Sequence, residues 1–182
     1  MLSDLQKQKL TRYFRVYDVD DDGAISLPDF ERVVENVRVL HGVGERSSIH
    51  SGLREGYLLR WSALSISADK DRDGRVDLDE WLAYWEGVLA DDVRYQAEIV
   101  AVTERLFEVF DTDEDGVLGA DEFCNFYGVY GLKSALARQV FVDLDEDGDG
   151  RVTRNELMDM AHQFYRSEDP SAPGNRLFGS TD

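Results

Sequence analysis

The stretch DKDRDGRVDLDE at residues 69–80 decides the fold of this chain, because its spacing of acids and glycine recurs three more times. Each copy has aspartate at positions 1, 3 and 5, glycine at position 6, an apolar residue at position 8 and a carboxylate at position 12. The four copies begin at Asp18, Asp69, Asp111 and Asp145. A single match to this pattern in an acidic protein is a solvated loop in roughly one case in five, but four copies in phase, each between amphipathic segments, exclude that interpretation.

This spacing supplies oxygen ligands for a hard divalent cation. Calcium takes roughly six to eight oxygens, and alternate residues of a tightly wound loop direct three carboxylates to one point. Position 7 adds a backbone carbonyl, position 9 a side chain or a water, and a glutamate at position 12 both of its oxygens. Glycine at position 6 allows a sharp bend that a Cβ would resist. The pattern therefore predicts four EF-hand calcium loops, each between two helices.

The predicted ligands stand at positions 1, 3, 5, 7, 9 and 12 of each loop, with position 7 binding through its carbonyl oxygen. In chain order they are Asp18, Asp20, Asp22, Ala24, Ser26 and Asp29; Asp69, Asp71, Asp73, Arg75, Asp77 and Glu80; Asp111, Asp113, Asp115, Val117 and Glu122; and Asp145, Asp147, Asp149, Arg151, Thr153 and Glu156. Position 9 of the third loop is Gly119, so a water molecule supplies that contact.

The four loops differ in their expected affinity. The second has the fullest set of acids, with Asp77 at position 9 and Glu80 at position 12, and the fourth is also complete. The first ends in Asp29, which is one methylene shorter than glutamate and gives a poorer bidentate contact. Lower coordination weakens calcium binding or favours magnesium. We therefore expect three to four calcium ions, with the first loop as the weakest calcium site or a magnesium site.

Apolar residues recur at helical intervals on both sides of the loops, which predicts an all-α fold of four helix-loop-helix units. At position 8 stand Ile25, Val76, Leu118 and Val152, and we expect paired loops to form short antiparallel β-bridges through them. Two such pairs then pack into one compact body, because no long flexible linker separates the halves at residues 91–92.

The spacing of the loops sets the expected boundaries. Loop starts are 51, 42 and 34 residues apart, so the extra length of the first half falls in a connection at residues 41–52, which contains glycines and serines. We expect an N-terminal pair at residues 1–90 (loops 18–29 and 69–80), a C-terminal pair at 91–166 (loops 111–122 and 145–156) and a tail at 167–182. Prolines and glycines break any helix in the tail, and Leu177 and Phe178 form an apolar plug that packs on the body.

Composition limits the classes of partner. The formal charge of −18 disfavours nucleic acid and anionic membranes and favours cations, and four divalent ions would reduce the charge to roughly −10, so metal binding and folding should be coupled. The single Cys124 excludes an internal disulfide and is expected to be a buried small residue. Neither a basic start followed by an apolar stretch nor a run of eighteen apolar residues occurs, and we expect a monomeric cytoplasmic protein whose protein partner, if any, is unidentified.

The loops, the long first spacing, the aromatic helices and the tail sequence DPSAPGNRLFG at residues 169–179 together resemble the sarcoplasmic calcium-binding proteins and the bacterial calerythrins. The resemblance covers almost the whole chain, and 16 arginines against four lysines favour a bacterial member. It implies two EF-hand pairs packed face to face and a role in calcium buffering or signalling. Members of that family often have decayed loops, whereas all four loops here have a full pattern.

Three functions remain open at this stage, and buffering is preferred. A sensor exposes a flexible groove that is usually rich in methionine, yet apart from Met1 only Met158 and Met160 are present. The alternative is a sensor that offers an apolar groove to a protein partner. A remote alternative is a chromophore-binding protein of the photoprotein or luciferin-binding type, whose candidate residues are Trp61, Trp81, Trp85, His41, His50 and His162. No arrangement of nucleophile and base occurs, so we expect no enzyme.

Overall fold

The computed structural model describes residues 1–40 and 48–179. In the N-terminal half, the segment order is helix, strand, helix, helix, strand, helix. These elements are α1 (Asp4–Tyr17), β1 (Ala24–Ile25), α2 (Leu27–Leu40), α3 (Ser48–Ala68), β2 (Val76–Asp77) and α4 (Leu78–Ala90). Helix α1 begins with the capping box that Ser3 and Gln6 form, in which each side chain accepts the backbone N–H of the other residue.

The C-terminal half repeats this order, and its first helix is a long one that contains a π-helical turn. The elements are α5 (Asp92–Tyr95), the π turn η1 (Gln96–Val100), α6 (Ala101–Phe110), β3 (Val117–Leu118), α7 (Ala120–Val129), α8 (Ser134–Leu144), β4 (Val152–Thr153), α9 (Arg154–Arg166) and the 3₁₀ turn η2 (Pro173–Arg176). Asp91 ends α4 and starts the long helix, because its carboxylate accepts the N–H groups of Val93 and Arg94. The all-α class with short β-bridges is confirmed.

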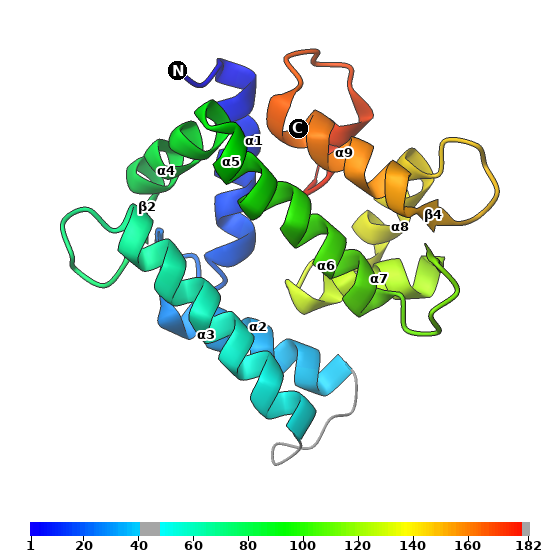
Figure 1. Ribbon diagram of the computed structural model, residues 1–182, viewed down its shortest axis with the longest axis horizontal. Helices are drawn as coiled ribbons and strands as arrows, with labels where there is room; N and C mark the ends of the chain where they lie inside the picture. Colours follow the sequence, from blue (N-terminus) through cyan, green and yellow to red (C-terminus); the bar gives the residue numbers. More distant parts are fainter. Residues whose placement is uncertain (41–47, 180–182) are drawn as a thin grey trace.

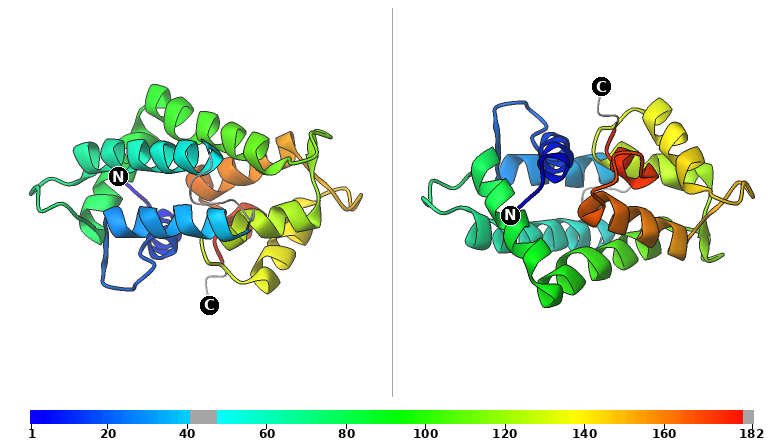
Figure 2. Two further views of the ribbon diagram at one scale, coloured as in Figure 1. Left: turned by 90° about the horizontal axis from the view of Figure 1, so that it is seen from below. Right: turned by 90° about the horizontal axis from the view of Figure 1, so that it is seen from above.

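The two pairs of loops lie at opposite ends of the molecule, with the helices between them (Figure 1, Figure 2). In the first pair Ile25 lies opposite Val76, and in the second Leu118 lies opposite Val152, both antiparallel. These four side chains are at most 1% exposed. The predicted pairing at position 8 is therefore confirmed, and it ties each loop to its partner through backbone hydrogen bonds and apolar packing.

The halves interlock along several helices. Helix α2 packs on α7, and the Asn36 side chain donates to the Val129 carbonyl across that contact at 3.0 Å. Helix α1 packs on α9, and Gln6 donates to the Tyr165 carbonyl at 3.1 Å. These contacts join helices of the N-terminal half to helices of the C-terminal half in one body.

Aromatic rings fill the centre. The ring of Tyr13 in α1 stacks on the ring of Phe178 in the tail, with 4.3 Å between the ring centroids, and its centroid lies 5.4 Å from that of Trp81 in α4. Trp85 stacks on Tyr165 of α9 at 5.0 Å. Leu177 and Phe178 are 5% and 8% exposed, so the end of the described tail is part of the hydrophobic core.

The structure differs from the expectations in three places. Helix α3 already begins at Ser48, so the connection is shorter than residues 41–52, and residues 41–47 lie outside the described residues. The tail contains the 3₁₀ turn η2, because Pro173 at its start has no N–H that the turn would leave unpaired. Cys124 is only partly buried against the core.

None of the described helices is long and apolar enough to cross a bilayer.

Candidate metal centres

The backbone of all four loops turns sharply at position 6. Its φ angle is +85° at Gly23, Gly74 and Gly116 and +80° at Gly150. This left-handed conformation is unfavourable for a residue with a Cβ, which explains the glycine there. The turn brings the aspartates on either side of it close together.

Each loop holds its aspartates in place with its own backbone N–H groups. The carboxylate of Asp18 accepts from Asp22 and Gly23 at 3.0 Å each, and the carboxylates of Asp69, Asp111 and Asp145 accept from the glycine five residues on at 2.9–3.0 Å. The position 5 aspartates accept from position 7 at 2.8–3.0 Å. These bonds orient each carboxylate, while its remaining lone pairs stay available to a cation.

The residue at position 12 closes each loop. In the fourth loop, Glu156 accepts from the Glu146 N–H at 3.1 Å and from the Thr153 N–H at 2.7 Å, so one carboxylate joins the start of the loop to the start of α9. Thr153 in turn caps α9, and the two residues form a capping box. The spacing of metal positions 9 and 12 is thus also the spacing of a helix start signal, and the outgoing helix is what orients the last ligand.

The structure gathers carboxylates in every loop, though with different members. In each group the oxygens lie within 4.8 Å of one another. The groups are Asp18, Asp20 and Asp22; Asp69, Asp71 and Asp73; Asp111, Asp113 and Glu122; and Asp145, Asp147 and Glu156. The residue at position 12 is therefore part of the group in the third and fourth loops, and Asp29 and Glu80 are outside it.

The first loop is the most buried. Asp18 is 6% exposed and Asp29 is 2% exposed. Burial, together with the charges of Asp22 and Asp29, raises the pKa of Asp18, although the N–H bonds from Gly23 and Asp22 oppose the shift. Both oxygens of Asp29 accept hydrogen bonds from the loop itself, from Val19 at 3.2 Å and Ser26 at 2.8 Å. A shorter side chain thus satisfies the loop backbone and does not reach the aspartate group.

In the third loop, hydrogen bonding outweighs burial in its effect on a carboxylate pKa, the opposite of the first loop. Desolvation would raise the pKa of Glu122, but hydrogen bonds from Gly119 and from the N–H and hydroxyl of Thr112 outweigh it and lower that pKa. Glu122 is therefore held as an anion that already lies among the aspartates, which favours a cation at this loop.

Arginines at position 7 join the paired loops. The Arg75 guanidinium lies 2.8 Å from an Asp22 carboxylate oxygen of the first loop, and Arg151 lies 3.7 Å from Asp115 of the third loop. The ligand spacing assigns position 7 only a backbone carbonyl ligand and gives its side chain no role. The contacts show that it lies against a position 5 carboxylate of the neighbouring loop, which only the pairing of the loops could reveal.

A second feature that the sequence reasoning missed is position 4. Asp21, Arg72 and Glu114 have positive φ angles of 57°, 63° and 60°, and the fourth loop has Gly148 there with φ of 73°. Gly148 was the available signal. Because glycine adopts this conformation without steric strain, the backbone of the fourth loop is less strained at position 4 than that of the other three loops.

Comparison with known proteins supports the same assignment. The EF-hand domain pair family matches residues 66–128, and the EF-hand family matches residues 11–34 and 137–161. The chain is 30% identical over 154 residues to a probable calcium-binding protein, CML16, of Oryza sativa subsp. japonica, with 84% of this chain and 76% of that protein covered. The chain therefore belongs to the EF-hand calcium-binding proteins.

Relatives over the full length narrow the class further. Sarcoplasmic calcium-binding proteins I, III and IV of Branchiostoma lanceolatum are 26% identical over 98% of both chains, and calerythrin of Saccharopolyspora erythraea is 21% identical over 91% of this chain and 94% of its own. The protein is of the sarcoplasmic calcium-binding protein and calerythrin type and binds calcium at up to four sites.

Solved structures show the same fold. The amphioxus sarcoplasmic calcium-binding protein has a TM-score of 0.75 at 24% identity and covers 99% of both chains. A Streptomyces coelicolor calcium-binding protein has a TM-score of 0.67 at 26% identity, covering 88% of this chain and 97% of its own. The coelenterazine-binding protein of Renilla muelleri has a TM-score of 0.73 at 20% identity, covering 98% and 99%.

Proposed function

We propose that this protein is an intracellular calcium buffer. The observation that carries the proposal is the buried tail: apolar helix faces that a sensor would uncover are packed against the other half and against Leu177 and Phe178. Phe178 lies between Tyr13 and Phe164, with ring centroids 4.3 Å and 5.1 Å away, and Leu177 is buried beside it. Met160 is 3% exposed, which supports a packing role for that side chain.

The interior is also held by polar contacts that would have to break before the faces separate. Arg12 donates to the Asn175 carbonyl at 2.9 Å and to the Gly179 carbonyl, and the Tyr127 hydroxyl donates to the Leu177 carbonyl. Each of these links the tail to a helix of the body. A calcium signal would have to supply the energy of several such contacts at once to open the molecule.

Retention on a phenyl resin with and without calcium tests the buffer proposal. We expect no calcium-dependent retention. The phenyl groups of the resin contact only the outer surface of the protein, and calcium should not change that surface. Retention that appears with calcium and disappears with a chelator would instead establish the alternative, a sensor that offers an apolar groove to a protein partner.

The remote alternative, a chromophore-binding protein, rests on a cavity and on the fold that the chain shares with the coelenterazine-binding protein. Trp81 and Trp85 line that cavity. Trp61 lies against Phe30 at 5.5 Å, and His162 is hydrogen-bonded to the Tyr95 hydroxyl at 3.1 Å. His41 and the side chain of His50 lie outside the described residues. Visible absorbance of the purified protein would support this alternative.

The assignment of individual ligands is part of the proposal. We assign each loop the residues at positions 1, 3, 5, 7, 9 and 12, with water in place of a side chain at Gly119 and magnesium as an occupant of the first loop. Calorimetric calcium titration with and without millimolar magnesium tests this, since competition should be confined to one site. We also propose that the two EF-hand pairs divide between residues 90 and 91. We propose further that the protein is a cytoplasmic monomer without nucleic acid or membrane partners.

A further inference from the structure

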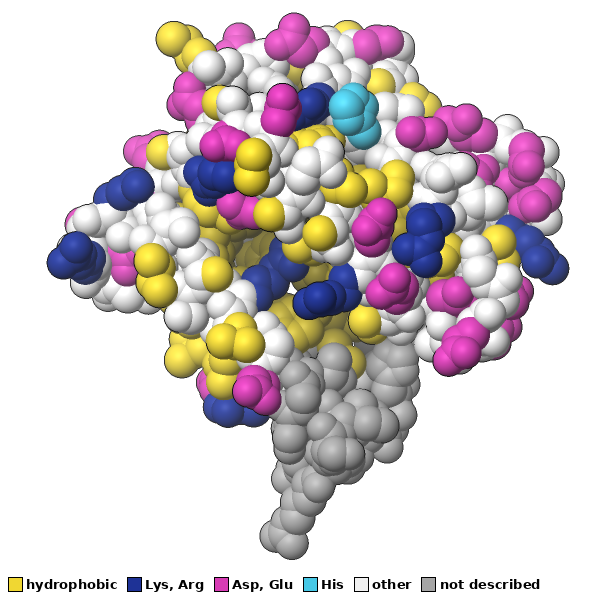
Figure 3. All heavy atoms as spheres, viewed as in Figure 1, with side chains coloured by type: hydrophobic (Ala, Val, Ile, Leu, Met, Phe, Trp, Pro, Cys, Tyr) yellow, Lys and Arg dark blue, Asp and Glu magenta, His cyan; other side chains and the backbone are white. Residues whose placement is uncertain are grey.

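Between the two halves lies a cavity of about 350 Å³, which we call the Arg60 cavity. Its walls come from α1, α2, α3, α4, the π-helical turn η1 and the start of α6. They are formed by Tyr13, Tyr17, Phe30, Arg60, Ala63, Leu64, Ser67, Trp81, Tyr84, Trp85, Ala97, Glu98 and Val102. A smaller compartment of about 50 Å³ on the C-terminal side shares Tyr13, Arg60, Glu98 and Val102 with it. Figure 3 shows a hollow in this face with hydrophobic walls and Lys or Arg side chains inside it.

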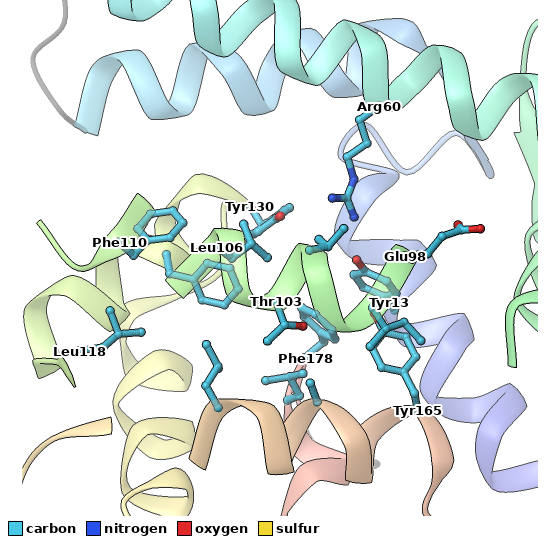
Figure 4. A pocket seen from close by; sticks show the side chains of 16 residues that line it. Tyr13, Arg60, Glu98, Thr103, Leu106, Phe110, Leu118, Tyr130, Tyr165 and Phe178 are labelled. Carbon is cyan, nitrogen blue, oxygen red and sulfur yellow. The ribbon is translucent and has the colours of Figure 1, made fainter. Parts of the chain in front are cut away.

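Arg60 stands at the boundary of the two compartments. Figure 4 shows its side chain reaching from α3 toward Tyr13 and Tyr130. Within the part of the chain that the structure describes, no carboxylate lies within ion-pair distance of its guanidinium. Glu98 lines the same cavity, but it pairs with Arg94 at 3.1 Å. A protein with a formal charge of −18 thus leaves a cation without an ion-pair partner in an aromatic interior.

Besides Glu98, the neighbours of Arg60 are neutral hydrogen-bonding groups. Burial raises the pKa of Tyr57 to about 12 and raises the pKa values of Tyr13 and Tyr130 well above their usual 10, so all three remain phenols at neutral pH. Trp85 is 4% exposed and lines the cavity, and its Nε1–H has no partner in the described residues. The partly buried Arg60 guanidinium, which has no ion-pair partner within the described part of the chain, and the unpaired buried N–H of Trp85 are both costly unless something accepts from them.

We propose that the Arg60 cavity binds one small aromatic acid, with the acid group at Arg60 and its rings among the tryptophans and tyrosines. An anion satisfies the guanidinium, and a ring or acceptor of the ligand reaches the Trp85 N–H. The cavity is more than twice the size of a cavity that holds one benzene, about 150 Å³, so two or three rings fit. The edge-to-face packing of Tyr13, Trp81 and Trp85 around the space suits a planar ligand better than an alkyl chain.

The test uses a matched pair of fluorescent probes. 8-Anilinonaphthalene-1-sulfonate carries an anionic group, and N-phenyl-1-naphthylamine is the same ring system without it. Binding to the calcium-loaded protein is followed by energy transfer from tryptophan, and its stoichiometry is measured by titration. The variants are Arg60→Gln, Arg60→Lys, Trp85→Phe and the exposed control Arg15→Gln. Circular dichroism and calcium stoichiometry establish that each variant is folded.

We expect one molecule of the anionic probe per chain. Arg60→Gln should weaken its binding about 10- to 100-fold and change binding of the neutral probe less than about threefold, because only the charged contact is lost. Arg60→Lys should recover most of the affinity for the anion, Trp85→Phe should weaken it several-fold, and Arg15→Gln should change neither probe.

The proposal is overturned if the wild-type protein fails to bind the anionic probe, if Arg60→Gln leaves its affinity unchanged, or if the variant weakens both probes equally. It is independent of the buffer role. A sensor groove would give calcium-induced retention on a phenyl resin and probe binding insensitive to Arg60, so the failure of one proposal is distinguishable from the failure of the other.

Discussion

The buried ammonium of Lys9 leads to a prediction about how the free energy of unfolding depends on pH. It lies on α1 and is 0% exposed, and its ammonium donates to the carbonyls of Gln163 and Ser167 and to the Asn175 side chain at 3.1, 2.8 and 3.0 Å. Burial, with a smaller effect of Arg12, lowers its pKa from 10.5 to about 8, while Glu168 opposes the shift. The folded protein should therefore release this proton at lower pH than the unfolded chain does.

The sign follows from proton linkage. Below pH 8 both states carry the proton, so the cost of the buried charge is constant. Between about pH 8 and 10.5 the unfolded chain binds more protons, so the free energy of unfolding rises with pH. The shift corresponds to about 3 kcal/mol across that window. Lys9→Met removes the titration and keeps the length of the side chain.

Urea denaturation followed by tryptophan fluorescence, in calcium-saturated buffer from pH 7 to 10.5, measures the effect. Carboxylate ligands are ionised throughout, and buried tyrosines titrate alike in both proteins. The difference in unfolding free energy between wild type and Lys9→Met should thus rise by about 3 kcal/mol in favour of the wild type. Lys7→Met, at an exposed position of the same helix, is the control and should give a flat difference. A flat line for Lys9→Met would refute the reasoning from burial.

Two further predictions concern the first loop and the tail. Asp29→Glu should increase calcium affinity at one site, on the order of tenfold, because the longer carboxylate can supply both oxygens; calorimetry that shows no change at any site would contradict this. Gly174→Ala should cost about 1–3 kcal/mol and lower Tm by several degrees, because a Cβ at residue 174 would lie 2.6 Å from the Met160 carbonyl oxygen and 2.4 Å from the Gln163 Cβ. Gly56→Ala, on an exposed helical face with open space around it, is the control, and an equal loss in both variants would remove the argument for close tail packing.

Most of the fold could be read from the sequence because its signals are local. The four loops and the helices beside them follow from spacings within about twelve residues, and the pairing of Ile25 with Val76 follows from the apolar residue that recurs at position 8 of each loop. In the third and fourth loops the residue at position 12 lies among the aspartates of positions 1 and 3, whereas Asp115 and Asp149 at position 5 are outside these groups. In the second loop Glu80 has the same chemistry and lies outside the group, which no spacing distinguishes.

What the amino-acid sequence determined by itself is the set of calcium loops, because coordination chemistry fixes residue types at short intervals along the chain. The tertiary structure alone decided the fate of residues whose partners are distant in sequence. Lys9 finds its acceptors at residues 163–175, and Arg60 finds tyrosines from α1 and from the end of α7. From the sequence alone, Lys9 and Arg60 cannot be distinguished from ordinary surface cations. Their roles arise because packing encloses Lys9 fully and Arg60 in part, and burial depends on the whole fold and not on neighbouring residues.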